Sequence, residues 1–341
     1  MRYLRNDITD PYYNMALDEY ALERLAIDTP LFYLWQNHRA VIIGANQSAC
    51  TEVDLDYLRG HGITLARRVT GGGAVYHDLG NLNYTIVGRN ADLNRDYPEY
   101  ASHILRALQA LGVEATLSGR NDILVGGRKV SGYAKRVYKD RLMVHGTLMY
   151  DVDLATLEGV LSPRPEKLVS KGIASVRSRV TNLRGHLPQV NGIAHFKECL
   201  ERHLSANYTD AEYLLTDADR HAIKELAQHK FATPEWIYGR RISSAACFAV
   251  PSTPPHTIRR TARLHCGTVE ATLAIVEGHI ATCLFGGDFI GNSPIISLES
   301  ALCGVRYERC ALRQRLVAIH LTDYLDGVDT DSLLDLLCPM P

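Results

Sequence analysis

Apolar residues along the first two-thirds of the chain follow both helical and extended spacings. Leu17, Ala21 and Leu25 fall on one helix face, after an Asp10-Pro11 pair that can cap and begin a helix. Short apolar runs bounded by turn residues predict strands at 31–35, 40–43, 83–87, 123–125 and 142–144. The first two of these flank a turn at 37–39. Because strands come in adjacent pairs and do not alternate regularly with helices, the pattern predicts an α+β fold with a mixed, largely antiparallel sheet flanked by helices.

Further amphipathic stripes predict helices at 104–111, ending at Gly112, and at 193–204 and 223–227. The segment 250–256 carries three prolines, which favour an extended linker. The sequence therefore predicts a catalytic domain at 1–249, a proline-rich linker at 250–256 and a small α+β accessory domain at 257–341. In the last domain we expect three strands, with a turn at Glu277-Gly278, and then helices at 312–325 and 331–337.

Composition narrows the possible functions. The 341 residues are 46% hydrophobic, and 37 Lys and Arg balance 38 Asp and Glu to a net charge of −1, which disfavours binding long nucleic acids by bulk charge. No run of 18 apolar residues predicts a membrane span, and the first residues lack a hydrophobic signal core. The eight cysteines form no CxxC pair, so we expect reduced thiols in a cytoplasm and neither a disulfide framework nor a cysteine-rich zinc site.

A glycine run is the first candidate for chemistry. Gly71, Gly72 and Gly73 follow Arg67-Arg68 in the segment RRVTGGGAVYHD. Successive glycines expose backbone N–H groups that can cradle a phosphate or carboxylate, and the arginines can pair with the same anion. The segment matches neither GxxxxGK[ST] nor a GxGxxG motif after a strand. A flexible hairpin loop with two solvated arginines is an equally good interpretation of this run alone.

A second candidate is the segment NDILVGGRKVSG, which predicts strand, tight turn and strand. Alternation places Lys129 and Ser131 on one face of the second strand. A buried lysine is costly unless it meets an anion, so this face fits a phosphate site, although an arbitrary hairpin lysine is more often exposed. Asp122, at the other end of the hairpin, can bind a metal, hold Lys129 or serve only as a turn residue.

Two histidines and a basic loop complete the candidates. His77 follows the glycine run, and His145 precedes a glycine that can let a ligand approach closely. A lone histidine on a strand is more often structural than functional. The segment 171–183 carries Lys171, Arg177 and Arg179 without a helical period, which is typical of a solvated loop or of one that contacts phosphate or an acidic partner.

Four segments together resemble the lipoate–protein ligase A family, in the same order. RRVTGGGAVYHDLGN resembles the family's lipoate- and ATP-binding loop, and NDILVGGRKVSGYA its catalytic lysine segment. VHGTLMYDVD and KGIASVRSRVTNL resemble the two segments that follow. The similarity covers most of 1–246, and the small domain after a linker resembles the layout of the full-length bacterial ligase.

The resemblance implies the fold of biotin and lipoate protein ligases and a two-step reaction. Lipoate and ATP give lipoyl-AMP and pyrophosphate, and a carrier lysine then displaces AMP. The implied carriers are lipoyl domains of 2-oxoacid dehydrogenase acyltransferases and the glycine-cleavage H protein. The implied nucleotide contacts are Arg68, Gly73, Ala74, Val75, Tyr76 and Lys129. The implied lipoate contacts are Lys129, Gly71, Gly72, His77 and His145, with Trp35, Glu19 and Leu17 as candidates for the apolar end of the pocket. Asp122 is implied as a ligand of Mg²⁺ on the phosphates.

Other functions remain as alternatives. The related octanoyltransferases use a cysteine nucleophile and no ATP. No cysteine lies between Cys50 and Cys199, so the loop before the lysine segment, TLSGRND, lacks that nucleophile. Biotin protein ligases have a glycine loop richer in alternating arginine. A non-catalytic paralogue that only binds lipoate is disfavoured because Arg68, the glycine run and Lys129 are all present.

Overall fold

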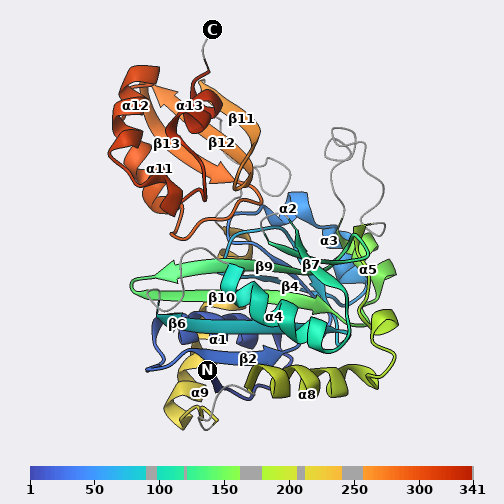
Figure 1. Ribbon diagram of the computed structural model, residues 1–341. Helices are drawn as coiled ribbons and strands as arrows, with labels where there is room; N and C mark the ends of the chain where they lie inside the picture. The colour runs from blue at the N-terminus through green and yellow to red at the C-terminus, as the bar shows by residue number, and fades with distance from the viewer. Residues whose placement is uncertain (90–97, 119–120, 162–178, 206–211, 240–255, 340–341) are drawn as a thin grey trace.

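The structure is a computed structural model that describes residues 1–89, 98–118, 121–161, 179–205, 212–239 and 256–339. Two sheets lie in the part before residue 240, and a third lies after residue 256 (Figure 1). The α+β class expected from the sequence is confirmed.

The larger sheet has seven strands in the order β1-β2-β6-β10-β9-β8-β7. Its neighbours are antiparallel except for the parallel pair of β1 and β2. Gly126 and Gly127, with φ of 56° and 75°, form the two-residue turn between β8 and β9, which requires the left-handed conformation at both positions. The strands are β1 (Arg2–Tyr3), β2 (Leu31–Trp35), β6 (Asn81–Arg89), β7 (Ala115–Ser118), β8 (Asp122–Val125), β9 (Arg128–Tyr138) and β10 (Arg141–Met149).

A smaller sheet has the order β4-β3-β5, formed by β3 (Ala40–Ile43), β4 (Thr64–Arg67) and β5 (Val75–His77). The strands predicted at 31–35 and 40–43 are therefore both present but do not pair with each other. The chain leaves the larger sheet after Trp35 and enters the smaller one at Ala40. Short spacing predicts two neighbouring strands, but it does not say that they share a sheet.

Helix α1 (Pro11–Glu23) joins the two sheets. The Asp10 carboxylate accepts hydrogen bonds from the backbone N–H of Tyr12 and Tyr13, as the sequence predicted for a helix start. The helix packs against β4 of the smaller sheet and against β6 and β10 of the larger one. The other helices before residue 240 are α2 (Ala49–Glu52), α3 (Leu55–Gly60), α4 (Pro98–Ala110), α5 (Leu154–Val160), α8 (Gly192–Ser205), α9 (Asp217–Leu226) and α10 (Pro234–Tyr238), with single turns at η1 (Arg184–His186) and η2 (Ala227–Phe231).

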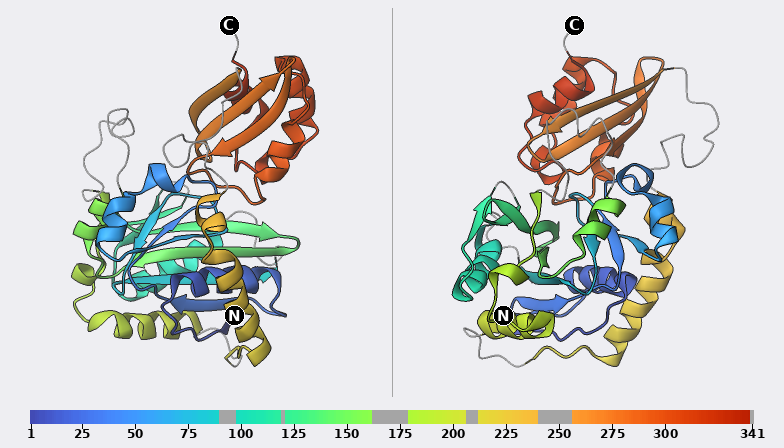
Figure 2. Two further views of the ribbon diagram at one scale, coloured as in Figure 1. Left: turned by 180° about the vertical axis from the view of Figure 1, so that it is seen from behind. Right: turned by 90° about the vertical axis from the view of Figure 1, so that its right-hand side faces the viewer.

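The C-terminal unit has its own apolar core between an antiparallel sheet and three helices (Figure 2). The turn at Glu277-Gly278 is confirmed, with φ of 49° and 75°. The predicted helix at 312–325 is shorter than expected, because helix α12 ends at Val317 and only a 3-10 turn follows. The elements are β11 (Thr257–Leu264), β12 (Gly267–Val276), β13 (His279–Gly286), α11 (Ile296–Leu302), α12 (Arg309–Val317), η4 (Leu321–Asp323) and α13 (Thr330–Leu337).

The C-terminal unit docks on the loops of the smaller sheet and on β9. Gly72 N–H donates to the Phe289 carbonyl at 3.1 Å, and Gly287 N–H donates to the Asn46 carbonyl at 3.0 Å. Lys135 Nζ lies 3.3 Å from Asp326 Oδ2. Most of the predicted linker 250–256, and most of the basic segment 171–183, lie outside the described residues.

The expectation of reduced thiols is wrong for Cys50, which is disulfide-bonded. Pairing between distant positions leaves no sign in local cysteine spacing, so the sequence did not reveal it.

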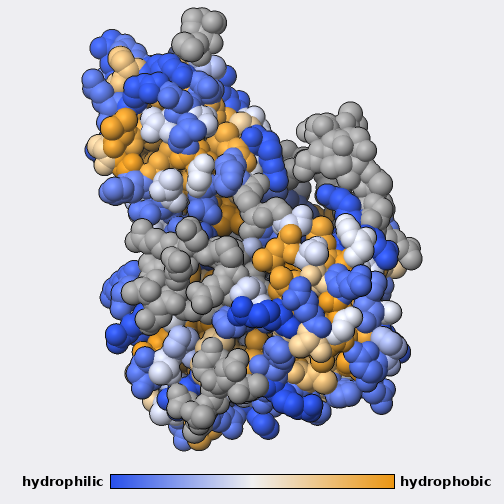
Figure 3. Space-filling model, in the orientation of Figure 1, coloured by the Kyte–Doolittle hydropathy of each residue, from blue (hydrophilic) through white to orange (hydrophobic). Residues whose placement is uncertain are grey.

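On the face shown in Figure 3, hydrophilic residues cover most of the lower margin. Among the described residues, no helix is both long and apolar enough to span a membrane.

Candidate active site

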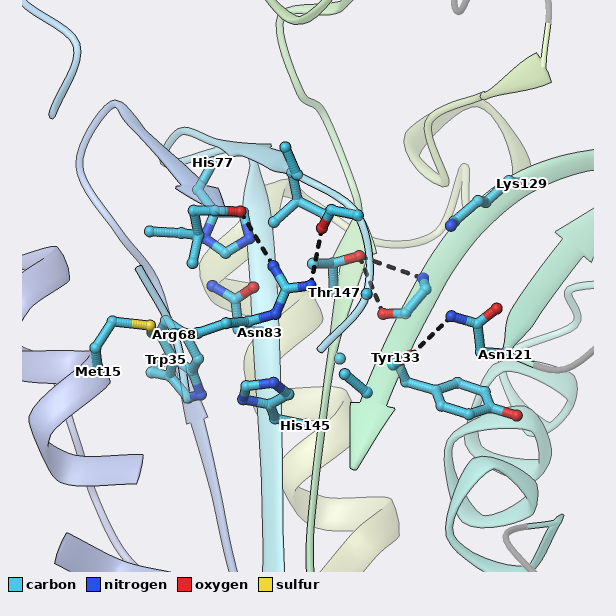
Figure 4. A pocket seen from close by; sticks show the side chains of 18 residues that line it. Met15, Trp35, Arg68, His77, Asn83, Asn121, Lys129, Tyr133, His145 and Thr147 are labelled. Carbon is cyan, nitrogen blue, oxygen red and sulfur yellow. Dashed lines mark hydrogen bonds between the residues drawn. The ribbon is translucent and has the colours of Figure 1, made fainter. Parts of the chain in front are cut away.

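A cavity of about 110 Å³ lies where helix α1 and the two sheets meet (Figure 4). Met15, Trp35 and His77 lie on one side of it, and Lys129 lies on the other. Apolar Met15 and Trp35 share the first side with the polar groups of Asn83 and His145, and Lys129 brings a cation to the second side. The lining residues are Met15, Trp35, Ile42, Arg68, Gly72, Gly73, Ala74, Val75, His77, Asn83, Asn121, Lys129, Gly132, Tyr133, Ala134, His145, Gly146 and Thr147.

A second cavity, of about 520 Å³, adjoins the first and shares Ala74, Val75, Lys129 and Thr147 with it. Tyr76 and Asp122 line only this second cavity. Lys129 therefore stands between a mainly apolar chamber and a larger chamber.

The buried Arg68 side chain holds the glycine loop in place through hydrogen bonds to its carbonyl groups. Its guanidinium donates to the carbonyls of Gly71 at 2.7 Å, Gly73 at 2.8 Å and Ile42 at 3.1 Å. Burial lowers the Arg68 pKa to about 10, so the group stays charged at neutral pH. Arg68 thus shapes the loop that lines the cavity, and its remaining N–H capacity is small.

Arg67 does not enter the cavity. It is 1% exposed, and it donates to the carbonyls of Gly44, Gln47 and Ile237. It ties the loop after β3 to helix α10. Two neighbouring arginines that looked alike in the sequence therefore have different roles.

Lys129 reaches the site because β9 is irregular. The register between β8 and β9 shifts between Ile123 and Leu124, so that Ile123 pairs with Ser131 but Leu124 pairs with Lys129. The extra residue, Val130, is fully buried in the core, and Ser131 is also fully buried and lines neither cavity. The expectation that Lys129 and Ser131 share a face is therefore wrong, because simple alternation fails at a bulge.

The bulge instead places Lys129 beside Gly132 and Asp122. Lys129 Nζ lies 2.7 Å from Asp122 Oδ1, and both side chains are 34% exposed. A Cβ atom at Gly132 would lie 2.6 Å from Nζ and 2.7 Å from Cε of Lys129. The lysine side chain therefore runs across the bare Cα of Gly132 and ends at the carboxylate.

A buried polar chain supports the glycine loop. Asp18 Oδ2 accepts from His145 Nδ1 at 2.7 Å, and His145 Nε2 lies 2.7 Å from the Thr70 hydroxyl. The Thr70 oxygen also accepts from Arg68 Nε at 3.0 Å. This chain, Asp18–His145–Thr70, links helix α1 through β10 to Arg68. It fixes His145 at the cavity wall through interactions on both ring nitrogens.

His77 is neutral under ordinary conditions. Burial, with smaller contributions from Arg68 and His145, lowers its pKa to about 3. Its ring stands edge-on to Trp35 with centroids 6.1 Å apart. It is therefore an uncharged donor and acceptor on the side of the site that holds Trp35.

The structure brings most of the candidates from the sequence to this site. Trp35, Arg68, Gly72, Gly73, Ala74, Val75, His77, Lys129 and His145 line the first cavity, and Tyr76 and Asp122 line the second. Gly71 lines neither, since it faces the Phe289 carbonyl of the C-terminal unit. Leu17 is fully buried in the core against other apolar residues.

Glu19 is not brought to the cavity. Both of its carboxylate oxygens bind Lys230 Nζ, at 2.6 and 2.7 Å. The preceding residue, Asp18, points toward the site instead, because adjacent helix residues are about 100° apart. Asp18, Thr70 and Gly132 were missed from the sequence. Only Gly132 had a local signal there, as a glycine inside a predicted strand.

Known proteins resemble the chain in both of its parts. Residues 10–205 match the lipoyl protein ligase A/B catalytic domain, and residues 253–337 match the bacterial lipoate protein ligase C-terminus. The chain is 34% identical to the lipoate-protein ligase LplJ of Bacillus subtilis over 97% of this chain and 98% of the relative.

The chain belongs to the lipoate–protein ligase family. Two solved members share its fold. One is a bipartite lipoate protein ligase from Thermoplasma acidophilum described with its E2 lipoyl domain, with a TM-score of 0.62, 32% identity and coverage of 70% of this chain and 96% of the other. The second is a lipoate-protein ligase A bound with ATP, with a TM-score of 0.59, 30% identity and coverage of 70% and 98%. The ligase family expected from the four motifs is thus confirmed over nearly the whole chain.

Proposed function

We propose that this chain is an ATP-dependent lipoate–protein ligase that serves lipoate salvage in the cytoplasm. It forms lipoyl-AMP from lipoate and ATP and then transfers the lipoyl group to a lysine of a carrier domain. Family membership supports the overall reaction. The position of Lys129 between two adjoining cavities of different size is the observation that carries the assignment of chemistry to residues.

The proposed substrates divide between the two cavities. The lipoyl chain fits the first cavity, whose far side is lined by Met15, Trp35 and His77. The nucleotide fits the larger second cavity, which Tyr76 and Asp122 line. Both cavities share Ala74, Val75 and Lys129, so a carboxylate from one side and an α-phosphate from the other meet at the lysine.

Lys129 acts electrostatically in the first step. A lipoate carboxylate oxygen forms a bond to the α-phosphorus of ATP, and the bond from that phosphorus to pyrophosphate breaks. A carboxylate and a triphosphate repel each other, so a cation between them lowers the barrier and orients both groups. Lys129 is not acylated. In the second step the carrier lysine attacks the acyl carbon, and AMP leaves with the electrons of the mixed anhydride bond.

Asp122 is the residue that suits a magnesium ion. Mg²⁺ in nucleotide sites is usually held by one or two carboxylates together with substrate phosphates. Among the described residues, no cluster of three or more histidine, cysteine or acidic side chains could hold a metal unaided. A single carboxylate beside the nucleotide cavity fits binding that phosphates complete. Bound there, the ion would neutralise phosphate charge.

The proposed carriers are lipoyl domains of 2-oxoacid dehydrogenase acyltransferases and the glycine-cleavage H protein. The octanoyltransferase alternative requires a cysteine nucleophile at the site. Neither cavity is lined by a cysteine among the described residues. This favours activation by ATP over a thioester route.

Mass spectrometry of a purified unmodified lipoyl domain tests the proposal. We expect the mass to rise by one lipoyl group when the enzyme, lipoate and MgATP are all present, and not when ATP is left out. Transfer of an octanoyl group from an acylated carrier without ATP would instead establish the transferase. Tight lipoate binding without either reaction would establish a non-catalytic paralogue.

A further inference from the structure

An unpaired hydrogen-bond donor lies on the side of the first cavity that holds Met15 and Trp35. His77 is 3% exposed and lines this cavity (Figure 4). Its Nε2 atom is buried and has no hydrogen-bond partner among the described residues. Buried polar atoms are nearly always paired, so such an atom beside a cavity points to a ligand that supplies the partner.

The surrounding amides decide which ring nitrogen of His77 carries the proton. Asn37 Nδ2 lies 3.1 Å from His77 Nδ1, and an amide nitrogen can only donate. The Asn37 side chain cannot be reversed, because its Oδ1 accepts from Asn14 Nδ2 at 2.8 Å. Asn14 is oriented in turn, since its Oδ1 accepts from Asn6 Nδ2 and its Nδ2 donates to the carbonyls of Ile8 and Gln36.

His77 Nδ1 is therefore an acceptor, and in the neutral ring the proton lies on Nε2. The low pKa of His77 keeps the ring neutral across the physiological range. The chain of hydrogen-bonded amides from Asn6 to Asn37 thus orients the His77 ring so that its Nε2–H points to the cavity wall. No described residue accepts a hydrogen bond from this N–H.

The position of this donor relative to Lys129 identifies what it meets. Figure 4 shows His77, Trp35 and Met15 on the side of the cavity away from Lys129. Trp35 Nε1 is already satisfied by the Thr85 hydroxyl at 2.9 Å, so Trp35 contributes an apolar surface. If the substrate carboxylate lies at Lys129, the tail of the acyl chain lies at His77.

We infer that His77 selects acyl tails that carry hydrogen-bond acceptors, and so favours the dithiolane of lipoate over the methyl end of octanoate. This inference rests on the proposed function. A dithiolane sulfur is a weak acceptor for the Nε2 proton, whereas a methyl end leaves the donor buried and unpaired. Sites with such donors discriminate against analogues that lack the acceptor.

The first test compares lipoate with octanoate in the acid-dependent exchange of labelled pyrophosphate into ATP. We expect the ratio of kcat/KM for lipoate over octanoate to fall about tenfold in His77→Phe, mainly through a gain with octanoate, because the variant lacks the donor that a methyl end leaves unpaired. Ile42→Val is the matched control, because it alters the cavity wall without removing a donor and should change both acids alike. An unchanged ratio in His77→Phe overturns the inference. Absence of exchange with either acid in the wild type overturns the proposed function instead.

A second test observes the wild-type protein directly and uses His77→Phe only to assign the signal. In ¹⁵N-labelled wild-type protein, NMR of the histidine rings should show His77 as the neutral Nε2–H tautomer, assigned by its loss in His77→Phe. Lipoate should shift the Nε2 and its proton, and octanoate should shift them much less. An Nδ1–H tautomer, or equal shifts with the two acids, contradicts the inference.

Discussion

The side chain of Lys129 lies directly over the Cα of Gly132. A Cβ at that glycine would come within 2.6 Å of the lysine nitrogen. The two residues share a face only because of the bulge in β9. Gly132 is therefore required for the position of the lysine and not for an unusual backbone angle.

Gly132→Ala should reduce lipoate-dependent pyrophosphate exchange by about a hundredfold, because a displacement of about 1 Å at a reacting group can cost that much. Thermal stability should change little by comparison, since the lysine is a flexible side chain that can move away. Gly185→Ala is the control, because no atom lies within 4 Å of the added Cβ. Equal exchange rates in Gly132→Ala and the wild type would rule out this positioning.

Two neighbouring acidic residues on helix α1 should respond differently to loss of charge. Asp18→Asn should lower kcat/KM for lipoate about tenfold, as is typical when an orienting partner of a functional histidine is removed. Glu19→Gln should leave the kinetics unchanged, because its partner Lys230 lies away from the cavity. It should lower the free energy of unfolding by about 1 kcal/mol, in the range of partly exposed ion pairs.

Steady-state kinetics and urea unfolding of both variants provide the comparison. Loss of lipoate activity in Glu19→Gln, with full activity in Asp18→Asn, would contradict this account. It would show that Glu19 contributes to lipoate activation and that the hydrogen-bonded chain Asp18–His145–Thr70 does not.

The buried His77 should make the protein less stable in acid. Its folded-state pKa of about 3 lies below the ordinary value of 6.5, so the unfolded chain takes up a proton first as the pH falls. Stability is therefore fully present above pH 6.5 and is lost as the pH falls toward 3. Between pH 7 and pH 5 this amounts to about 2 kcal/mol from the one group.

His77→Gln should therefore lose about 2 kcal/mol less than the wild type over that interval. Urea unfolding followed by tryptophan fluorescence is the suitable measurement, since both tryptophans, Trp35 and Trp236, lie before residue 240. Parallel losses in the two proteins would mean that His77 titrates normally in the folded state.

The contact between the glycine loop and the C-terminal unit predicts a change of shape. A Cβ at Gly71 would lie 2.3 Å from the Phe289 carbonyl oxygen, which is too close for both to stay in place. Gly71→Ala should therefore weaken docking and raise the radius of gyration in small-angle X-ray scattering. Gly73→Ala, where the added Cβ meets nothing within 4 Å, should scatter like the wild type. Identical profiles for all three proteins would show that this contact does not hold the two units together.

Much of the fold could be predicted from local patterns. The start of α1 at Asp10-Pro11, the turn at Gly126-Gly127 and the alternation of short strands follow from residue types over a few positions. The division of β2 and β3 between two sheets could not be predicted, because pairing depends on partners far along the chain.

The site shows the same division. The glycine loop and Lys129 belong to continuous motifs, so the sequence indicated them. The orientation of Lys129 depends on a bulge, and the choice of Asp18 over Glu19 depends on how α1 lies between the sheets. Arg67 and Arg68 are neighbours in sequence with the same charge. Only their tertiary contacts show that Arg67 binds helix α10 whereas Arg68 shapes the glycine loop.

The most direct test of the account is lipoate-dependent exchange of labelled pyrophosphate into ATP by the wild type and by Lys129→Ala. We predict exchange that requires lipoate in the wild type, and a loss of at least about a hundredfold in the variant, as expected for removal of a charge that stabilises the transition state. Circular dichroism of the two proteins should match. Undiminished exchange in Lys129→Ala would contradict the claim that the lysine between the two cavities brings the carboxylate and the α-phosphate together.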